Sequence, residues 1–208
     1  MHKEQMISRC PSSRYIGLGT LHDYELFFAG RTDRAVASVR PRPGVDVPIV
    51  IWEVSENDIY GSLDYYEGYP RLYDRAEIEI EDESGEIILG LIYVMTDRYA
   101  KIDGLPTKLY YTIIEEAYHN LGLPLYPLKN ALKNSRQNFI AMKIEELKDF
   151  QKRGLYNFCP SCGHELDKHP AISRKCNVEI CSNCGIREAL EDLISEKRPL
   201  SDWHYFKK

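Results

Sequence analysis

Two Cys-x-x-Cys pairs constrain the fold of this chain more than any other feature. Cys159-Pro160-Ser161-Cys162 and Cys181-Ser182-Asn183-Cys184 are separated by 18 residues, a spacing typical of a zinc site with four thiolate ligands. A glycine follows each pair, Gly163 and Gly185, where the backbone must bend around the metal. Four thiolates leave a tetrahedral zinc ion without an open position. We therefore expect Cys159, Cys162, Cys181 and Cys184 to hold a structural zinc ion.

The alternatives for these cysteines are reduced free thiols or a reversible disulfide. Cys176 lies outside both pairs, and we interpret it as a loop thiol and not as a ligand. His164 and His169 are further potential ligands, but four thiolates already complete the site. A segment as short as residues 155–208 has a small core and needs such a crosslink. The cysteines thus predict a zinc ribbon at the end of the chain.

Composition narrows the classes of function. The net charge is -5 and the pI is near 5.7, and residues 155–208 contain eight basic and eight acidic side chains. This balance argues against a nucleic-acid partner for the whole chain and for the ribbon. The longest apolar runs, such as Ile87 to Met95, are far shorter than the roughly 20 residues of a membrane span. The first residues do not resemble a secretion signal, so we expect a cytoplasmic protein with reduced thiols.

The order of secondary structure predicts an α+β fold. Apolar and β-branched runs predict strands near residues 15–20, 24–29, 34–40, 47–54, 73–81 and 87–94, the last two forming a hairpin. Helical spacing and caps predict helices at 55–66, 107–121, 125–133, 140–150 and 186–194. Ala189, Leu190 and Leu193 are the expected packing face of the last helix. Strands with one inserted helix, followed by helices, favour α+β over a doubly wound sheet.

The segment Leu63 to Pro70 contains a carboxylate in an unusual place. Gly68 is the left-handed residue expected to end the helix from Ser55 to Tyr66. Glu67 then lies at the negative end of the helix dipole among tyrosines, and both influences raise the pKa of a carboxyl group. A raised pKa suits proton transfer near neutral pH. The alternative is that Glu67 is an ordinary exposed residue at a helix end.

Residues 1 to about 134 contain several short stretches that occur together, in the same order, in one known family. These stretches are Arg9-Cys10-Pro11, Leu21 to Phe28, Val36 to Val39 ahead of Pro41, Trp52-Glu53-Val54, Leu63-Asp64 with Glu67 to Pro70, Tyr73, Tyr93-Val94-Met95, and Pro106 followed by Tyr110. The segment containing Glu67 and Gly68 is the most specific of them. By these matches, residues 1 to about 134 resemble a gamma-glutamylcyclotransferase-like domain.

The resemblance implies a small mixed β-barrel flanked by helices. It also implies that Glu67 takes a proton from the α-amino group of a γ-glutamyl compound, whose amine attacks the γ-carbonyl and releases 5-oxoproline. By the same resemblance, Tyr73 and Tyr110 line the substrate pocket. Such a ring closure between groups of one molecule needs no metal or organic cofactor, so the zinc ion is expected to be structural only.

The sequence departs from the family pattern in ways that keep a second interpretation open. Family members normally begin with a strand ending in Tyr-Gly-Ser-Asn, whose backbone N–H groups hold the substrate carboxylate, and the match here begins just after that loop. Ala35 and Ile49 occupy positions where the family usually has glycine. Either the strand is encoded upstream of Met1, or the domain is a degenerate binding or adaptor protein that recruits a protein partner through the ribbon or the aromatic tail around Trp203.

We therefore expect three parts. Residues 1–134 form the gamma-glutamylcyclotransferase-like domain with a small-molecule γ-glutamyl substrate. Residues 135–154 form a helical linker, and residues 155–208 form the zinc ribbon with its helix and aromatic tail.

Overall fold

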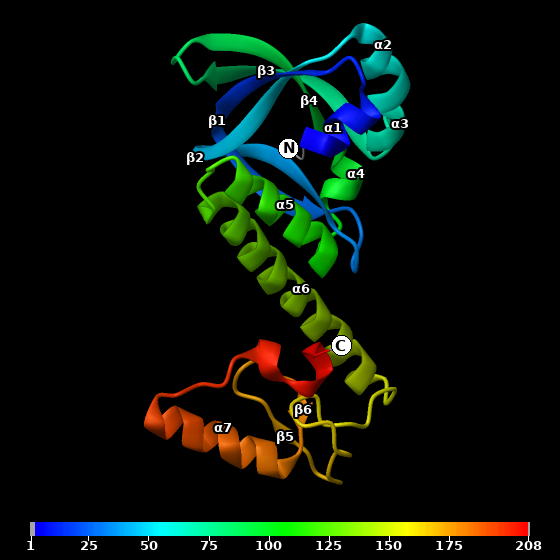
Figure 1. The fold of residues 1–208 in the computed structure, drawn as a ribbon. Coiled ribbons are helices and arrows are strands. Elements are labelled where there is room, and N and C mark those ends of the chain that lie inside the picture. Colours follow the sequence, from blue (N-terminus) through cyan, green and yellow to red (C-terminus); the bar gives the residue numbers. More distant parts are fainter. Residues whose placement is uncertain (1–2, 208) are drawn as a thin grey trace. The chain divides into compact units, whose positions relative to one another are not determined.

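The computed structural model describes residues 3–207 and contains two compact units, Met1–Arg136 and Gln137–Lys208 (Figure 1). The first unit combines a four-stranded antiparallel sheet with short helices. The second contains a two-stranded sheet, a helix and a cluster of four cysteines. The predicted α+β class is confirmed. Among residues 3–207, no helix is long and apolar enough to cross a membrane.

Two long strands form most of the sheet in the first unit. The strands are β1 (Arg14–Ala29), β2 (Val36–Glu53), β3 (Tyr73–Asp82) and β4 (Ile87–Met95), in the order β2-β1-β3-β4. The sequence predicted four short strands where β1 and β2 lie. Strand β1 continues through the predicted turn because the turn residue is accommodated as a shift in the pairing register. This shift lies between His22 and Tyr24, where Asp23 has a φ of 59°. Prolines 41, 43 and 48 are tolerated because β2 is an edge strand.

The two edges of this sheet approach each other. The backbone N–H of Met95 on β4 donates a 2.9 Å hydrogen bond to the buried hydroxyl of Ser38 on β2. Leu21, Val47, Ile78 and Ile80 form a buried cluster on the inner side of the strands. The sheet therefore curls around an apolar core and has the character of a small barrel.

A helical segment interrupted by one wide turn leads to the candidate site. It comprises α2 (Glu56–Asp58), the π-helical η1 (Ile59–Leu63) and α3 (Asp64–Glu67). The side chain of Ser55 accepts a hydrogen bond from the backbone N–H of Asp58 and caps the start. Gly68, with a φ of 67°, ends it in the left-handed conformation. The predicted start and end of this segment are both confirmed.

The remaining helices of the first unit are α1 (Lys3–Arg9), α4 (Asp97–Ala100), α5 (Lys108–Asn120) and the beginning of α6 (Tyr126–Lys152). Thr107 caps α5 through a hydrogen bond from the backbone N–H of Tyr110, as predicted. The sequence suggested two short helices where α6 runs for 27 residues. The polar stretch between them contains no glycine or proline, and the hydroxyl of Ser135 within it is buried and donates to the carbonyl of Gly104.

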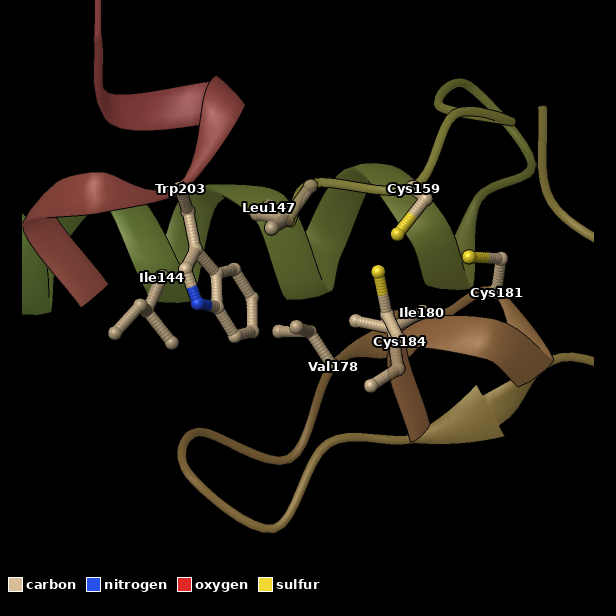
Figure 2. Packing of buried hydrophobic residues seen from close by; sticks show 8 residues of the cluster. All are labelled: Ile144, Leu147, Cys159, Val178, Ile180, Cys181, Cys184 and Trp203. Atoms are coloured by element: carbon tan, nitrogen blue, oxygen red, sulfur yellow. The ribbon is translucent and has the colours of Figure 1, made fainter. Parts of the chain in front are cut away.

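The second unit packs around three of its cysteines and one tryptophan. Its elements are the end of α6, β5 (Ala171–Ile172), β6 (Glu179–Ile180), α7 (Ser182–Ile194) and the short η2 (Leu200–Asp202) and η3 (His204–Phe206). Figure 2 shows Trp203 beside Ile144 and Val178, at one end of the cluster that also contains Cys159, Cys181 and Cys184. Trp203 is 1% exposed. The aromatic tail therefore belongs to the core of its own unit.

Helix α7 buries a different face from the predicted one. Leu190 and Leu193 are 55% and 80% exposed, whereas Cys184, Gly185 and Glu188 are buried. The carboxylate of Glu188 accepts hydrogen bonds from the hydroxyl of Ser173 and the backbone N–H of Arg174. The cysteine and these polar contacts orient the helix, and its leucines remain in solvent.

Candidate active site and metal centre

Glu67 is held at the C-terminal end of α3, facing the last turn of α1. Its side chain is 28% exposed, and its Oε1 atom lies 4.0 Å from Nη1 of Arg9. Burial raises the pKa of the Glu67 carboxyl, and the positive charge of Arg9 opposes that rise. The structure therefore places a carboxyl group with a raised pKa at the predicted position.

Tyr73 and Tyr110 converge on one peptide unit of β2. The Tyr73 hydroxyl donates a 2.5 Å hydrogen bond to the carbonyl of Ala37, and the backbone N–H of Ala37 donates a 3.1 Å bond to the Tyr110 hydroxyl. Burial raises the pKa of both phenols, and the charge of Glu67 raises each further. The three predicted residues of the first unit are thus brought together. The Tyr110 hydroxyl accepts from Ala37 and keeps its own proton available for a ligand.

A second layer of contacts fixes α3 against the β3–β4 hairpin. The Tyr93 hydroxyl on β4 donates a 2.7 Å hydrogen bond to Asp64 on α3, and Arg75 Nε on β3 lies 3.7 Å from the same carboxylate. The Arg75 guanidinium also covers the ring of Tyr69, 4.2 Å from its centroid. Because Asp64 and Glu67 share one turn of helix, these contacts determine where the Glu67 carboxylate lies.

A cavity of about 360 Å³ opens beside these residues. Its wall is apolar along α5 and the sheet, with two polar side chains from α1 and two tyrosine side chains from α5. The lining residues are Gln5, Arg9, Leu26, Ala37, Tyr110, Ile113, Ile114, Ala117 and Tyr118. Glu67 and Tyr73 lie next to two lining residues: Glu67 faces the guanidinium of Arg9, and the Tyr73 hydroxyl donates to the carbonyl of Ala37. The volume is sufficient for a small molecule with one apolar side.

Sequence reasoning missed Arg9, Ala37 and Tyr118 as parts of the site. Tyr118 is fully buried, and its hydroxyl has no hydrogen-bond partner among residues 3–207. A ligand atom is a natural partner for such a group. Arg9 was matched only as part of a family stretch, and no local pattern pairs it with a carboxylate 58 positions away. The tyrosines expected to shield Glu67 also differ, because Tyr66 is 55% exposed and carries the Arg9 guanidinium 4.9 Å above its ring.

The four predicted cysteines of the second unit form one cluster. The sulfur atoms of Cys159, Cys162, Cys181 and Cys184 all lie within 4.8 Å of one another, and those of Cys162 and Cys181 are 3.7 Å apart. Four ligands about 2.3 Å from a tetrahedral zinc ion lie about 3.8 Å from each other. Figure 2 shows the sulfur atoms of Cys159, Cys181 and Cys184 pointing toward a common centre. This arrangement can hold a metal ion.

Two other candidate ligands, Cys176 and His164, are not part of the cluster. Cys176 is half-buried with its thiol 3.7 Å from the Ser173 hydroxyl, and it is not part of the group. His164 Nδ1 lies 3.4 Å from the sulfur of Cys162.

Hydrogen bonds from the backbone N–H groups of Cys181 and Cys162 outweigh burial and lower the pKa of the Cys159 thiol, whereas burial raises the pKa of the Cys184 thiol. A bound cation would favour the ionised form of all four thiols.

Comparisons with known proteins identify solved structures of similar fold. A solved structure described as gamma-glutamyl cyclotransferase superposes with a TM-score of 0.55 at 26% sequence identity, over 62% of this chain and 79% of the other. A human protein described as uncharacterized protein loc79017 superposes with a TM-score of 0.54, with the same identity and coverage. No curated protein sequence matches the chain. The family model described as gamma-glutamyl cyclotransferase, AIG2-like, matches residues 1–112. This match covers more than half of the sequence, and the chain therefore belongs to the gamma-glutamyl cyclotransferase, AIG2-like family.

Proposed function

We propose that the chain cyclises a γ-glutamyl amino acid or γ-glutamylamine to 5-oxoproline and releases the amine, with Glu67 as the general acid/base. The observation that carries this proposal is the half-buried carboxyl of Glu67, whose pKa is raised by burial, next to a cavity of substrate size. Family membership and the similarity to a structure described as gamma-glutamyl cyclotransferase support the reaction type.

The proposed reaction is a proton transfer followed by an intramolecular acyl transfer. The Glu67 carboxylate accepts a proton from the substrate's α-ammonium group, and the free amine nitrogen attacks the γ-carbonyl carbon. A new C–N bond closes the five-membered ring, and the bond to the leaving nitrogen breaks as that nitrogen takes the proton back from Glu67. The ring nitrogen then passes its second extra proton through Glu67 to the released amine, so the products are a neutral lactam and an ammonium ion. No electrons are exchanged. The raised pKa of Glu67 suits both directions of transfer near neutral pH.

The cavity residues provide positioning and charge. Arg9 faces both the cavity and Glu67, so its guanidinium is the proposed partner of the substrate's α-carboxylate. The free proton of the Tyr110 hydroxyl is available to the γ-carbonyl oxygen, where negative charge develops during attack. Ile113 and Ile114 give the leaving group an apolar surface.

We further propose that the second unit is a structural zinc ribbon and does not take part in the reaction. In this division, residues 1–134 carry the site and residues 155–208 form the ribbon. The helical linker, residues 135–154, contributes Ile144 and Leu147 to the core of the ribbon. Cys159, Cys162, Cys181 and Cys184 would hold the ion as thiolates. Free thiolates require a reducing environment, which fits the cytoplasmic location expected from the sequence.

A second candidate function is a binding or adaptor protein without catalysis that recruits a protein partner through the ribbon. The observation that favours it is the apolar side of α7, where Ile186, Leu190, Leu193 and Ile194 are all more than half exposed. Trp203 does not contribute to such a surface, because it is buried in the core of the same unit.

An assay of 5-oxoproline release distinguishes the two functions. The chain is tested both as given and extended by the residues encoded upstream of Met1. Each protein is incubated with a panel of γ-glutamyl amino acids and γ-glutamylamines, and 5-oxoproline is measured by chromatography. We expect turnover of at least one compound and a loss of at least about a hundredfold in kcat/KM for Glu67→Gln, which keeps the shape and removes the base.

The matched control is Glu56→Gln, which neutralises an exposed carboxylate of α2 and should retain full activity. Absence of 5-oxoproline with every compound, or full activity of Glu67→Gln, would contradict the proposed reaction and leave the adaptor role as the better account.

A further inference from the structure

The outer face of the β3–β4 hairpin carries an apolar row beside an acidic row. On β4, Ile87, Leu89 and Leu91 are 55%, 68% and 45% exposed. Their partners in the antiparallel register of β3 are Glu81, Glu79 and Glu77, in that order. Directly opposed residues of a β-pair point to the same side of the sheet, so the six side chains form two parallel stripes. We call this surface the striped face; Figure 1 shows the hairpin that carries it.

The apolar row of β4 is not part of the barrel core. The alternate residues of the hairpin, Ile78 and Ile80 on β3 and Ile88 and Ile92 on β4, already contribute to the barrel core. An antiparallel sheet with one face on its core normally presents polar side chains on the other. Exposed apolar side chains on an edge strand invite association with another molecule. Since β4 is an edge strand, its three outer apolar residues call for an explanation beyond folding.

The acidic row gives this surface a definite charge. Glu77 and Glu79 are exposed, and no residue from 3 to 207 forms an ion pair with them. Glu81 is 2.8 Å from Nε2 of His22 at the far end of the row. Residues 76–96 contain six acidic residues and no lysine, arginine or histidine. The hairpin is therefore a negative surface with an apolar strip along one side.

We propose that the striped face binds a basic amphipathic helix of a protein partner. Residues 87, 89 and 91 span about 13 Å along a strand, and positions i, i+4 and i+8 of a helix span about 12 Å, so one apolar helix face matches the apolar row. The glutamate row lies one strand away, about 4.8 Å to the side. Lysine or arginine side chains on that flank of the helix reach the free carboxylates of Glu77 and Glu79.

The negative charge of the striped face also argues against a second copy of this chain or an anionic membrane as its partner. Two copies of this chain packed face to face would bring glutamate rows together, and an anionic membrane would repel the same carboxylates. The striped face is separate from the cavity, which is lined from α1, α5 and the strands β1 and β2. The inference is therefore independent of the proposed cyclotransferase reaction.

The test uses a labelled synthetic helix with leucines at i, i+4 and i+8 and lysines on one flank, followed by fluorescence anisotropy. A second peptide has glutamate in place of every lysine. We expect the full-length chain to bind the lysine peptide at low ionic strength, and salt to weaken the complex. Glu77→Lys/Glu79→Lys should lower this affinity at least about tenfold and increase affinity for the glutamate peptide, and Leu89→Lys should weaken the complex with the lysine peptide.

The control is Glu116→Lys/Glu196→Lys, which changes net charge by the same amount at two exposed positions elsewhere and should bind like the unaltered chain. The thermal midpoint of each variant reports whether the fold is kept. Equal binding of the two peptides, no response to charge reversal, a dimer abolished by Leu89→Lys, or adsorption to phosphatidylglycerol vesicles would each overturn the proposal.

Discussion

At the residue scale, two opposed influences set the pKa of Glu67. Burial raises it, and the Arg9 guanidinium 4.0 Å away lowers it. Because the base must be ionised, kcat/KM should rise with pH through the pKa of Glu67. Arg9→Met removes the opposing charge, so we expect the acid limb of the pH–rate profile to move to higher pH by up to about one unit. Arg9→Lys keeps the positive charge and should leave the acid limb of the pH–rate profile close to its original pH. A limb that stays at its original pH in Arg9→Met would show that Arg9 does not influence the base.

At the scale of elements, His22 ties three strands together. Its Nδ1 lies 2.9 Å from Asp46 on β2 and its Nε2 lies 2.8 Å from Glu81 on β3. Only the protonated ring donates to both, and the hydrogen bonds to Asp46 and then Glu81 raise its pKa in the folded state. The resulting stability is complete below the unfolded pKa of about 6.5 and is lost as pH rises through the higher folded value. His22→Gln should therefore lower the thermal midpoint most at low pH, and the difference from the unaltered chain should shrink above about pH 6.5. His119→Gln, on the exposed side of α5, is the control. A difference in thermal midpoint between His22→Gln and the unaltered chain that stays constant with pH would contradict this role of His22.

The same scale shows what the sequence could and could not predict. The helix before Gly68 and the helix after Thr107 were predicted correctly, because their caps are local: Ser55, Gly68 and Thr107 each act within a few residues. The continuity of β1 and β2 was missed because long-range pairing, such as His22 with Asp46, overrides local turn residues. The prediction of the buried face of α7 was wrong, because a cysteine of the four-cysteine cluster and the contacts of Glu188 outweigh the leucine pattern. Likewise, the approach of Arg9 to Glu67 depends on tertiary packing that no spacing encodes.

At the scale of the whole molecule, the two units have separate cores of different kinds. The first unit surrounds several apolar clusters, including those of Leu21 with Ile78 and of Phe28 with Tyr118. The main cluster of the second unit contains three of the four clustered cysteines, together with Trp203. In the proposed zinc ribbon, the second core depends on the cation that neutralises its thiolates, whereas the first core does not. The chain also contains one tryptophan in each unit, Trp52 and Trp203.

Removal of the metal should therefore unfold one unit and spare the other. In a Trp52→Phe variant, Trp203 is the sole tryptophan, and it is 1% exposed. We expect a strong chelator to release about one zinc ion per chain and to shift its emission to the red as the ribbon opens. Thermal unfolding of the first unit should be unchanged. Cys181→Ser should lose the metal and show the red-shifted emission from the start, whereas Cys176→Ser, which alters the one cysteine of this unit outside the cluster, should keep both the metal and the native emission. Metal analysis below about half an equivalent in protein purified without chelator, or unchanged emission after metal release, would contradict the structural zinc site.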